Sequence, residues 1–278
     1  MKKVKICGII MFLILLCPFV IKAEEQNYEI APNYFVSNSK IIRTVSLLDE
    51  EGNVLSTSDF ELTEEQFESN YVSPQEYMFK RNLSTTYSTN PSTSYSTDTK
   101  RLTMTVTYIP NGSYRKRIDI ECEWLKMPNV RLYDVIGWTV TNTESNVRYN
   151  YTYSVKQIYD DSTGAAQEIE YIYNSGNRVT ADNGEALVMN VVNDAKTRLK
   201  MTYTQEIETD TIEATFKGSY QHATSTSITA NEAKSLTFGT SASSGYQVIG
   251  GAFIYTTSIA NKYDRMSGVT VNYNPAGL

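Results

Sequence analysis

Residues 101–108 read RLTMTVTY and residues 117–124 read RIDIECEW. Apolar and polar side chains alternate in both stretches, and a period of two is the pattern of a β-strand that buries one face. The sequence Pro110-Asn111-Gly112 lies between them and is a turn signal. The two stretches therefore predict an antiparallel hairpin with one apolar face, and this hairpin decides the fold class.

The length of the hairpin loop sets which residues face each other. A two-residue loop would place apolar side chains opposite polar ones, because a shift of one residue turns every side chain to the other face. A three-residue loop over 110–112, closed by a left-handed glycine, restores the match. We therefore expect Met104 to face Ile118 and Arg101 to face Glu121.

The same alternation recurs at short spacing as far as the C-terminus. Further strands are expected over residues 132–141, 149–158, 168–173, 186–192, 199–208, 212–220, 236–239, 246–255 and 269–273. Turns rich in Gly, Asn and Asp separate them, and no long apolar helical period follows residue 99. The pattern predicts an all-β domain over residues 100–278, an antiparallel β-sandwich that is jelly-roll-like or barrel-like.

Two of these inferences concern single segments. Residues 248–255 are apolar on both faces, which predicts a central strand in which Gly250 and Gly251 ease a bend. Residues 84–99 contain 11 Ser or Thr in 16 positions, which favours a linker or a solvated loop. An edge strand in this second segment is the alternative.

The preceding residues, 24–83, are expected to form a small α+β segment. Residues 40–48 predict a short strand. The sequence Thr63-Glu64-Glu65-Gln66 has the form of a capping box, which predicts a short helix through Glu68.

The first residues, 1–23, have the organisation of a secretory signal peptide. Three lysines precede an apolar run of 16 residues, and Ala23 offers a cleavage position before acidic residues. The run is shorter than the roughly 20 residues that span a bilayer. Lipid attachment at Cys17 is disfavoured because the large Leu16 precedes it. We therefore expect a secreted, extracellular protein.

The net charge and the cysteine content exclude one class of partner and one kind of cross-link. Cleavage would remove four lysines and leave 21 basic against 31 acidic residues, a net charge near −10. Such a chain repels nucleic acid, so no nucleic-acid partner is expected. Cys122 would be the one remaining cysteine, which permits no intramolecular disulfide. An exported chain without disulfides favours a Gram-positive bacterial source.

Residue types suited to catalysis are few. His222 is the single histidine, and no Gly-x-Ser-x-Gly elbow accompanies it, so a nucleophilic site is not expected. Cys122 lies on the apolar face of its strand, where a thiol packs as a small hydrophobic group. The sequence predicts no catalytic residue, no cofactor and no metal site.

Acidic side chains form two further candidate functional sites. Asp119, Glu121 and Glu123 form a row with a spacing of about 6.5 Å, which suits either a glycosidase or a solvated sheet face, and Arg101 and Arg117 nearby favour the face. Asp134 shares the apolar face of its strand. It is expected to form an ion pair, with Arg131 or another basic residue; a bound cation is the alternative.

Three tyrosines alternate on one predicted strand, at positions 149, 151 and 153. An exposed row of this kind would make a flat platform for a glycan or a protein, since Tyr combines an apolar ring with a polar tip. A packed sandwich face is the alternative. Tyr149, Tyr151, Tyr153 and Asp134 are the candidate binding residues.

The sequence favours a non-enzymatic extracellular β-sandwich that binds a surface glycan or protein. A β-pore-forming toxin is the first alternative, because the Ser/Thr-rich residues 221–245 could unfurl as a hairpin, and only this alternative involves membrane contact. A carboxylate-based glycan hydrolase is the second.

Overall fold

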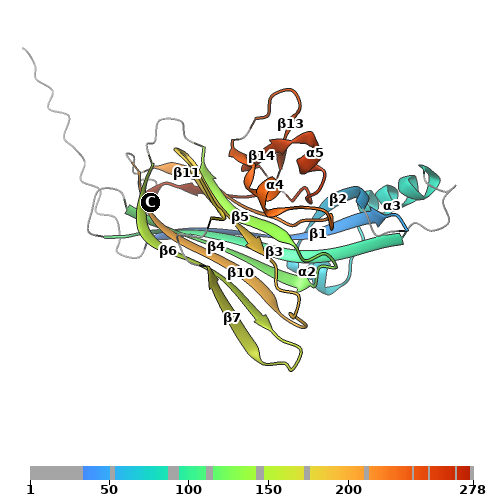
Figure 1. Cartoon of the computed structure of the whole chain (residues 1–278). Helices are drawn as coiled ribbons and strands as arrows, with labels where there is room; N and C mark the ends of the chain where they lie inside the picture. The colour runs from blue at the N-terminus through green and yellow to red at the C-terminus, as the bar shows by residue number, and fades with distance from the viewer. Residues whose placement is uncertain are drawn as a thin grey trace, which may run out of the picture. The chain divides into compact units, whose positions relative to one another are not determined.

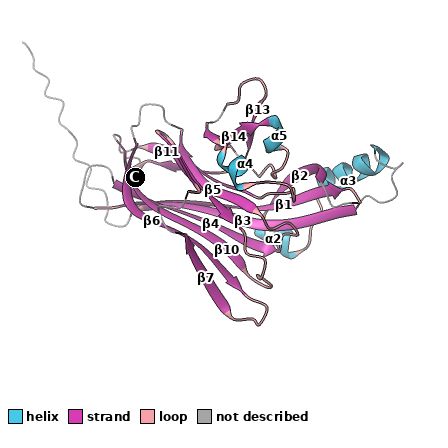
Figure 2. Cartoon of the chain, in the orientation of Figure 1, coloured by secondary structure: helices cyan, strands magenta, loops and turns pink. Residues whose placement is uncertain are grey.

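A computed structural model describes residues 34–50, 54–86, 94–110, 115–141, 147–171, 176–209, 213–239, 241–249, 251–266 and 268–275. Within these ranges, the side chains of residues 54, 83–86 and 148–152 are not described. The predicted signal peptide, residues 1–23, lies outside the described residues. Strands make up most of the described chain and short helices lie beside them (Figure 2).

The larger of two main sheets has seven strands in the order β2-β1-β3-β4-β10-β6-β7, and every neighbouring pair is antiparallel (Figure 1). Its strands are β1 (Phe35–Leu48), β2 (Val54–Leu62), β3 (Ser94–Tyr108), β4 (Arg115–Lys126), β6 (Val147–Asp160), β7 (Ala166–Tyr171) and β10 (Leu199–Thr209). The predicted hairpin, now β3 and β4, lies near the middle of this sheet.

The second main sheet has five antiparallel strands in the order β15-β11-β5-β9-β8. Its strands are β5 (Tyr133–Val140), β8 (Arg178–Ala181), β9 (Gly184–Asn190), β11 (Ala214–Gln221) and β15 (Val269–Tyr273). The two sheets enclose one apolar core, to which Leu102, Ile120 and Met201 contribute from one side and Trp138 and Phe216 from the other. The predicted antiparallel β-sandwich is therefore confirmed.

A small C-terminal lobe covers the other face of the five-stranded sheet. It contains α4 (Ala230–Lys234), β12 (Thr237–Phe238), β13 (Tyr246–Ile249), β14 (Phe253–Thr256) and α5 (Thr257–Ala260). The lobe forms a second apolar core with Val135 and Val188 of the sheet, to which Phe253 and Tyr255 contribute from β14. The five-stranded sheet is thus buried on both faces at this position.

Two helices lie between β2 and β3, α2 (Glu64–Glu68) and α3 (Pro74–Thr86). The predicted capping box of α2 is confirmed: the Gln66 backbone N–H donates to Thr63 Oγ1 at 3.2 Å, and the Thr63 N–H donates to Gln66 Oε1 at 2.9 Å. Helix α3, which the sequence analysis did not predict, is tied to β1 by an ion pair between Arg43 and Glu76. Among the described residues, no helix is both long and apolar enough to cross a membrane.

The predicted register of the β3–β4 hairpin is wrong by two residues. Met104 pairs with Ile120, and Arg101 pairs with Glu123 rather than Glu121. A shift of two leaves every side chain on its predicted face, so the apolar pattern is satisfied by both pairings. The hairpin loop is longer than three residues, since the Ile109 N–H bonds to the carbonyl of Arg115.

Two segments also differ from the prediction. Residues 94–99 are not a linker but the first part of β3, paired with β1 on one side. Residues 248–255 are not one central strand: β13 and β14 form a hairpin in which Ile249 pairs with Phe253. Gly251 has φ +83°, a left-handed conformation that glycine adopts without strain and that a tight turn requires.

The residues before position 84 do not form a sheet of their own. Strands β1 and β2 belong to the same seven-stranded sheet as β3 and β4, and residues 31–278 form one compact unit. Residues 94–99 therefore do not divide two domains, and residues 87–93 of the predicted linker lie outside the described residues.

Candidate functional site

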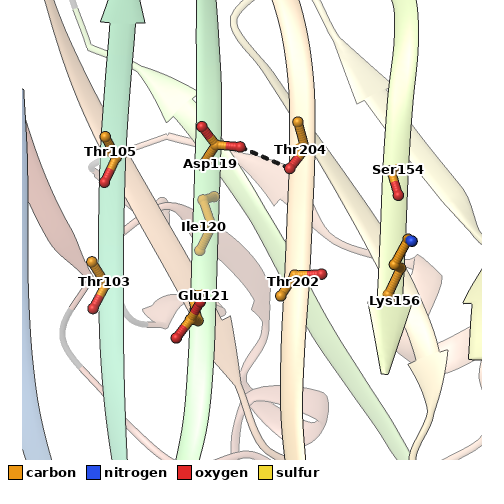
Figure 3. A pocket seen from close by; sticks show the side chains of 9 residues that line it. All are labelled: Thr103, Thr105, Asp119, Ile120, Glu121, Ser154, Lys156, Thr202 and Thr204. Carbon is orange, nitrogen blue, oxygen red and sulfur yellow. Dashed lines mark hydrogen bonds between the residues drawn. The ribbon is translucent and has the colours of Figure 1, made fainter. Parts of the chain in front are cut away.

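The solvent-facing side of the seven-stranded sheet carries a polar depression with a volume of about 410 Å³, which we call the outer hollow (Figure 3). Its lining residues are Thr103, Thr105, Asp119, Ile120, Glu121, Ser154, Lys156, Thr202 and Thr204. They come from four adjacent strands, β3, β4, β10 and β6. All are polar except Ile120, whose side chain is buried beneath the hollow.

The pairing of the strands places these side chains in two rows. One row contains Thr105, Asp119, Thr204 and Ser154, and the other contains Thr103, Glu121, Thr202 and Lys156. Short hydroxyl side chains stand between longer charged ones, which leaves the face hollowed where the threonines lie. The outward alternation of β3 and β4, predicted from the sequence, therefore builds this surface.

The charged groups of the hollow are already paired. Thr204 Oγ1 donates to Asp119 Oδ1 at 2.8 Å, and Arg117 Nε donates to the other oxygen at 2.8 Å. Lys200 Nζ lies 2.5 Å from Glu121 Oε2. The third carboxylate of the predicted row, on Glu123, pairs with Arg101. The hollow offers hydrogen-bond donors and acceptors at fixed spacing to a polar ligand.

Of the three tyrosines in the predicted row, only Tyr153 has a described side chain. Tyr153 is half-buried, packs against the sandwich core, and its ring meets that of Tyr203 edge-on at 5.4 Å between centroids. Tyr149 and Tyr151 belong to β6, but their side chains lie outside the described residues. Tyr153 therefore packs against the sandwich core, as the alternative to an exposed platform predicted.

Asp134 lies at the start of β5 and is fully buried. His222 Nδ1 is 3.0 Å from each carboxylate oxygen, the Ala223 N–H donates at 2.8 Å, and the Tyr220 hydroxyl also donates. Asp134 is therefore paired with a basic residue, as predicted, and that residue is His222. The suggested partner Arg131 instead donates to backbone carbonyls.

Asp134 belongs to a larger group that the sequence analysis did not find, which we call the buried charge cluster. Its members are Asp59, Asp98, Lys100, Asp134, His222 and Asp264. Asp98 and Lys100 have the same parity on β3 as Leu102 and Met104, so extending the predicted alternation backwards would have placed both on the inner face. No group of three or more His, Cys, Asp or Glu in the described chain is arranged to hold a metal ion.

Burial and mutual charge shift the pKa values in this cluster. Burial raises the pKa of Asp59 to about 7, and the negative charge of Asp264 adds to the shift. Burial also raises the pKa of Asp98. Burial lowers the pKa of Lys100, but the charges of Asp264, Asp98 and Asp59 outweigh it, so the pKa is raised on balance.

The His222–Asp134 pair predicts a pH dependence of stability. Burial lowers the pKa of His222, but the Asp134 carboxylate outweighs burial and the pKa is raised. The stabilisation is therefore fully present below the unfolded value of about 6.5 and is lost as the pH rises through the folded pKa. We expect urea unfolding to show a lower free energy of unfolding at about pH 8 than at about pH 6, by on the order of 1 kcal/mol.

The control for this pH dependence is His222→Gln, which retains a donor for Asp134 but does not titrate. This variant should show a smaller difference between the two pH values, and the remainder belongs to Asp59, whose pKa of about 7 lies in the same range. An unchanged slope in the variant would assign the pH dependence to other groups.

The segment proposed to unfurl as a membrane hairpin, residues 221–245, is folded where it is described. It contributes α4 and β12, and its apolar side chains Ile228, Ala233 and Leu236 are buried in the C-terminal lobe. Unfurling would have to remove these side chains from their core.

Comparison with known proteins does not place this chain in a family. No family model matches the sequence, and no curated protein matches it. The tailspike protein 4 enzymatically active domain of bacteriophage CBA120 is 18% identical, with 38% of this chain and 14% of that chain covered and a TM-score of 0.22. The full-length major pilin SpaD of Corynebacterium diphtheriae is 8% identical, with 70% of this chain and 62% of that chain covered and a TM-score of 0.25. The identities and TM-scores are too low to carry an inference about function.

Proposed function

We propose that the protein is a non-enzymatic, secreted module that binds a surface glycan through the outer hollow. The observation that carries the proposal is the pair of polar rows across four strands, in which hydroxyls alternate with carboxylates and one ammonium group. Glycans present many hydroxyls, each both donor and acceptor, and such a ligand needs matched donors and acceptors at fixed positions. Secretion is part of the proposal and rests on the signal-peptide pattern of residues 1–23.

The composition of the hollow favours a glycan over a protein partner. The centres of protein–protein interfaces are enriched in aromatic residues and depleted of charged ones. The outer hollow has the opposite composition, with Asp119, Glu121 and Lys156 in its lining and no aromatic side chain. Paired carboxylates and ammonium groups also remain available as hydrogen-bond acceptors and donors, because each is partly exposed.

The test compares two threonine variants on the same strand and face. Thr103 lines the hollow, whereas Thr107 lies four residues further along β3 and outside it. If a glycan array identifies a ligand, Thr103→Val should weaken its binding about fivefold, since a lost hydrogen bond is worth about 1 kcal/mol. Thr107→Val should leave the affinity unchanged. Titration calorimetry on the purified protein measures both.

Lys156→Ala provides a second readout, with a larger expected loss of affinity because charged hydrogen bonds are stronger, about 1.5–3 kcal/mol. Both variants should retain the unfolding midpoint of the parent protein. Equal affinities for the Thr103, Thr107 and Lys156 variants would place the ligand elsewhere, and an array without any bound glycan would contradict the proposal itself.

A further inference from the structure

Lys100 and Asp264 meet inside the protein with no solvent exposure of either side chain. Lys100 Nζ contacts Asp264 Oδ2, and the two residues are 164 positions apart in the sequence. Lys100 comes from β3 of the seven-stranded sheet, and Asp264 comes from the segment between α5 and β15. The contact therefore joins the middle of one sheet to the chain that leads into the edge strand of the other.

The Asp264 carboxyl group is held in one orientation. Its Oδ1 accepts hydrogen bonds from Gln221 Nε2 at 3.0 Å and from the His222 backbone N–H at 3.2 Å. The Asp264 backbone N–H donates to the His222 carbonyl at 2.9 Å. Two donors thus occupy one carboxyl oxygen while the Lys100 amine contacts the other. Donors in this position stabilise the negative charge that develops on Oδ1 when a nucleophile attacks the carbon.

The Lys100 amine lies among aromatic rings. Its Nζ is 4.8 Å from the centre of the Trp124 ring and 6.0 Å from that of Tyr220, and the side chains of Trp124 and Tyr220 are buried. These rings keep bulk water away from the pair. A reaction that releases water is favoured in such surroundings, and the reverse hydrolysis lacks its reactant.

Two further carboxyl groups of the buried charge cluster are available to accept a proton. Within the described part of the chain, Asp98 Oδ1 and Asp59 Oδ2 are buried without a hydrogen-bond partner. Asp98 is two residues before Lys100 on the same face of β3, and both carboxyls interact electrostatically with Lys100 and Asp264. A buried carboxyl oxygen without a partner is costly unless it has a role, and proton transfer is one.

We propose that Lys100 and Asp264 become joined by an amide bond between Nζ and Cγ, formed by the folded chain without a co-reactant. The proton that Lys100 Nζ directs at Oδ2 first moves to that oxygen, which leaves Nζ with a lone pair and Asp264 as a neutral acid. Nζ then attacks Cγ of Asp264, and the bond from Cγ to Oδ2 breaks. Of the three protons on the Lys100 ammonium group, one stays on the amide nitrogen and two leave with Oδ2 as one water molecule. Asp98 and Asp59 relay these protons and end unchanged. No atom is oxidised or reduced.

The amide resolves an energetic conflict that a permanent ion pair retains. Each charged group costs several kcal/mol to bury, and the attraction between the two offsets this only in part. Amide formation removes both charges and leaves Oδ1 as a carbonyl oxygen that keeps its two donors. The fold also holds the two reacting groups next to each other, so the reaction does not depend on their meeting by diffusion. The cross-link would close the chain between residues 100 and 264.

Mass spectrometry of the denatured full chain tests the proposal. The protein should weigh about 18 Da less than its sequence requires, the mass of one water. Trypsin should release a branched peptide in which residues 82–101, uncut after Lys100, carry the tripeptide Tyr263-Asp264-Arg265. Lys100→Arg and Asp264→Ala should each restore the full sequence mass.

Two variants separate bond formation from folding. Asp264→Asn can form the same amide by losing ammonia, so it should weigh about 17 Da less than its own sequence and give the same branched peptide. Lys116→Arg changes another buried lysine and should keep the loss of one water. A folded parent protein with its full sequence mass, or a water loss that maps to other residues, would overturn the proposal and leave a buried ion pair.

Discussion

Replacement of Asp264 by alanine is expected to lower the free energy of unfolding by at least about 3–5 kcal/mol, because it leaves the fully buried Lys100 without its acidic partner. If the amide has formed in the parent protein, the variant also loses the closure of a long loop, worth about 5 kcal/mol more. Urea unfolding followed by tryptophan fluorescence measures the loss, since Trp124 lies against the cluster. The effect is therefore among the largest that one substitution can have in this chain.

A double variant separates these two contributions. Lys100→Met combined with Asp264→Leu removes both charges and fills the space, so it should recover the part of the loss that comes from an unpaired buried charge. It cannot recover the loop closure. Lys40→Ala is the surface control: its pair with Glu61 is partly exposed, and it should cost no more than about 1 kcal/mol. Equal losses for Asp264→Ala and Lys40→Ala would contradict this account of the pair.

The alternation of side chains predicts the sandwich because burial on one face is a local property of each strand. Residues 101–108 and 117–124 show their inner and outer faces in the sequence itself, and the structure keeps those faces. The register of two paired strands, in contrast, is not determined by the pattern within either strand. Pairing Met104 with Ile118 or with Ile120 buries the same side chains, so only the loop distinguishes the two, and Pro110-Asn111-Gly112 favours a shorter loop than the one that forms.

The composition of residues 94–99 predicts a solvated segment where a strand forms. Ser and Thr solvate loops, but Thr is also a good strand residue, and here the segment pairs with β1 from Ser94 to Thr99. The informative residues were Asp98 and Lys100, two charges on the inward parity of a strand. Such residues need partners, and those partners lie in distant segments whose position no local pattern reveals.

In the candidate sites too, local sequence patterns predict some features, whereas others depend on which strands are neighbours. The outer hollow consists of polar residues on one face of neighbouring strands, and the carboxylate row of β4 was visible as a pattern. Its second half, Thr202, Thr204 and Lys156, depends on β10 lying between β4 and β6. Likewise, the burial of Asp134 followed from its parity, whereas its pairing with His222 required strands β5 and β11 to be neighbours.

Gly137 lies in the middle of β5, the central strand of the five-stranded sheet, and pairs with Ala186 on one side and Ser219 on the other. A Cβ at this position would lie 2.6 Å from the Ala186 Cα and would also overlap the carbonyl oxygen of Glu185. These are backbone atoms of the paired strand, so no side-chain rotation can make room.

Gly137→Ala should therefore force β5 and β9 apart and lower the free energy of unfolding by at least about 3 kcal/mol, at the upper end of overpacking effects. Gly176→Ala is the matched control, because a Cβ there meets nothing within 4 Å, and it should change stability by less than about 0.5 kcal/mol. Urea unfolding of both variants measures the difference. Because both core clusters draw residues from β5, the loss should appear as one cooperative transition at lower urea rather than as early melting of the C-terminal lobe. Equal stability of the two variants would mean that β5 and β9 do not approach as closely as this pairing requires.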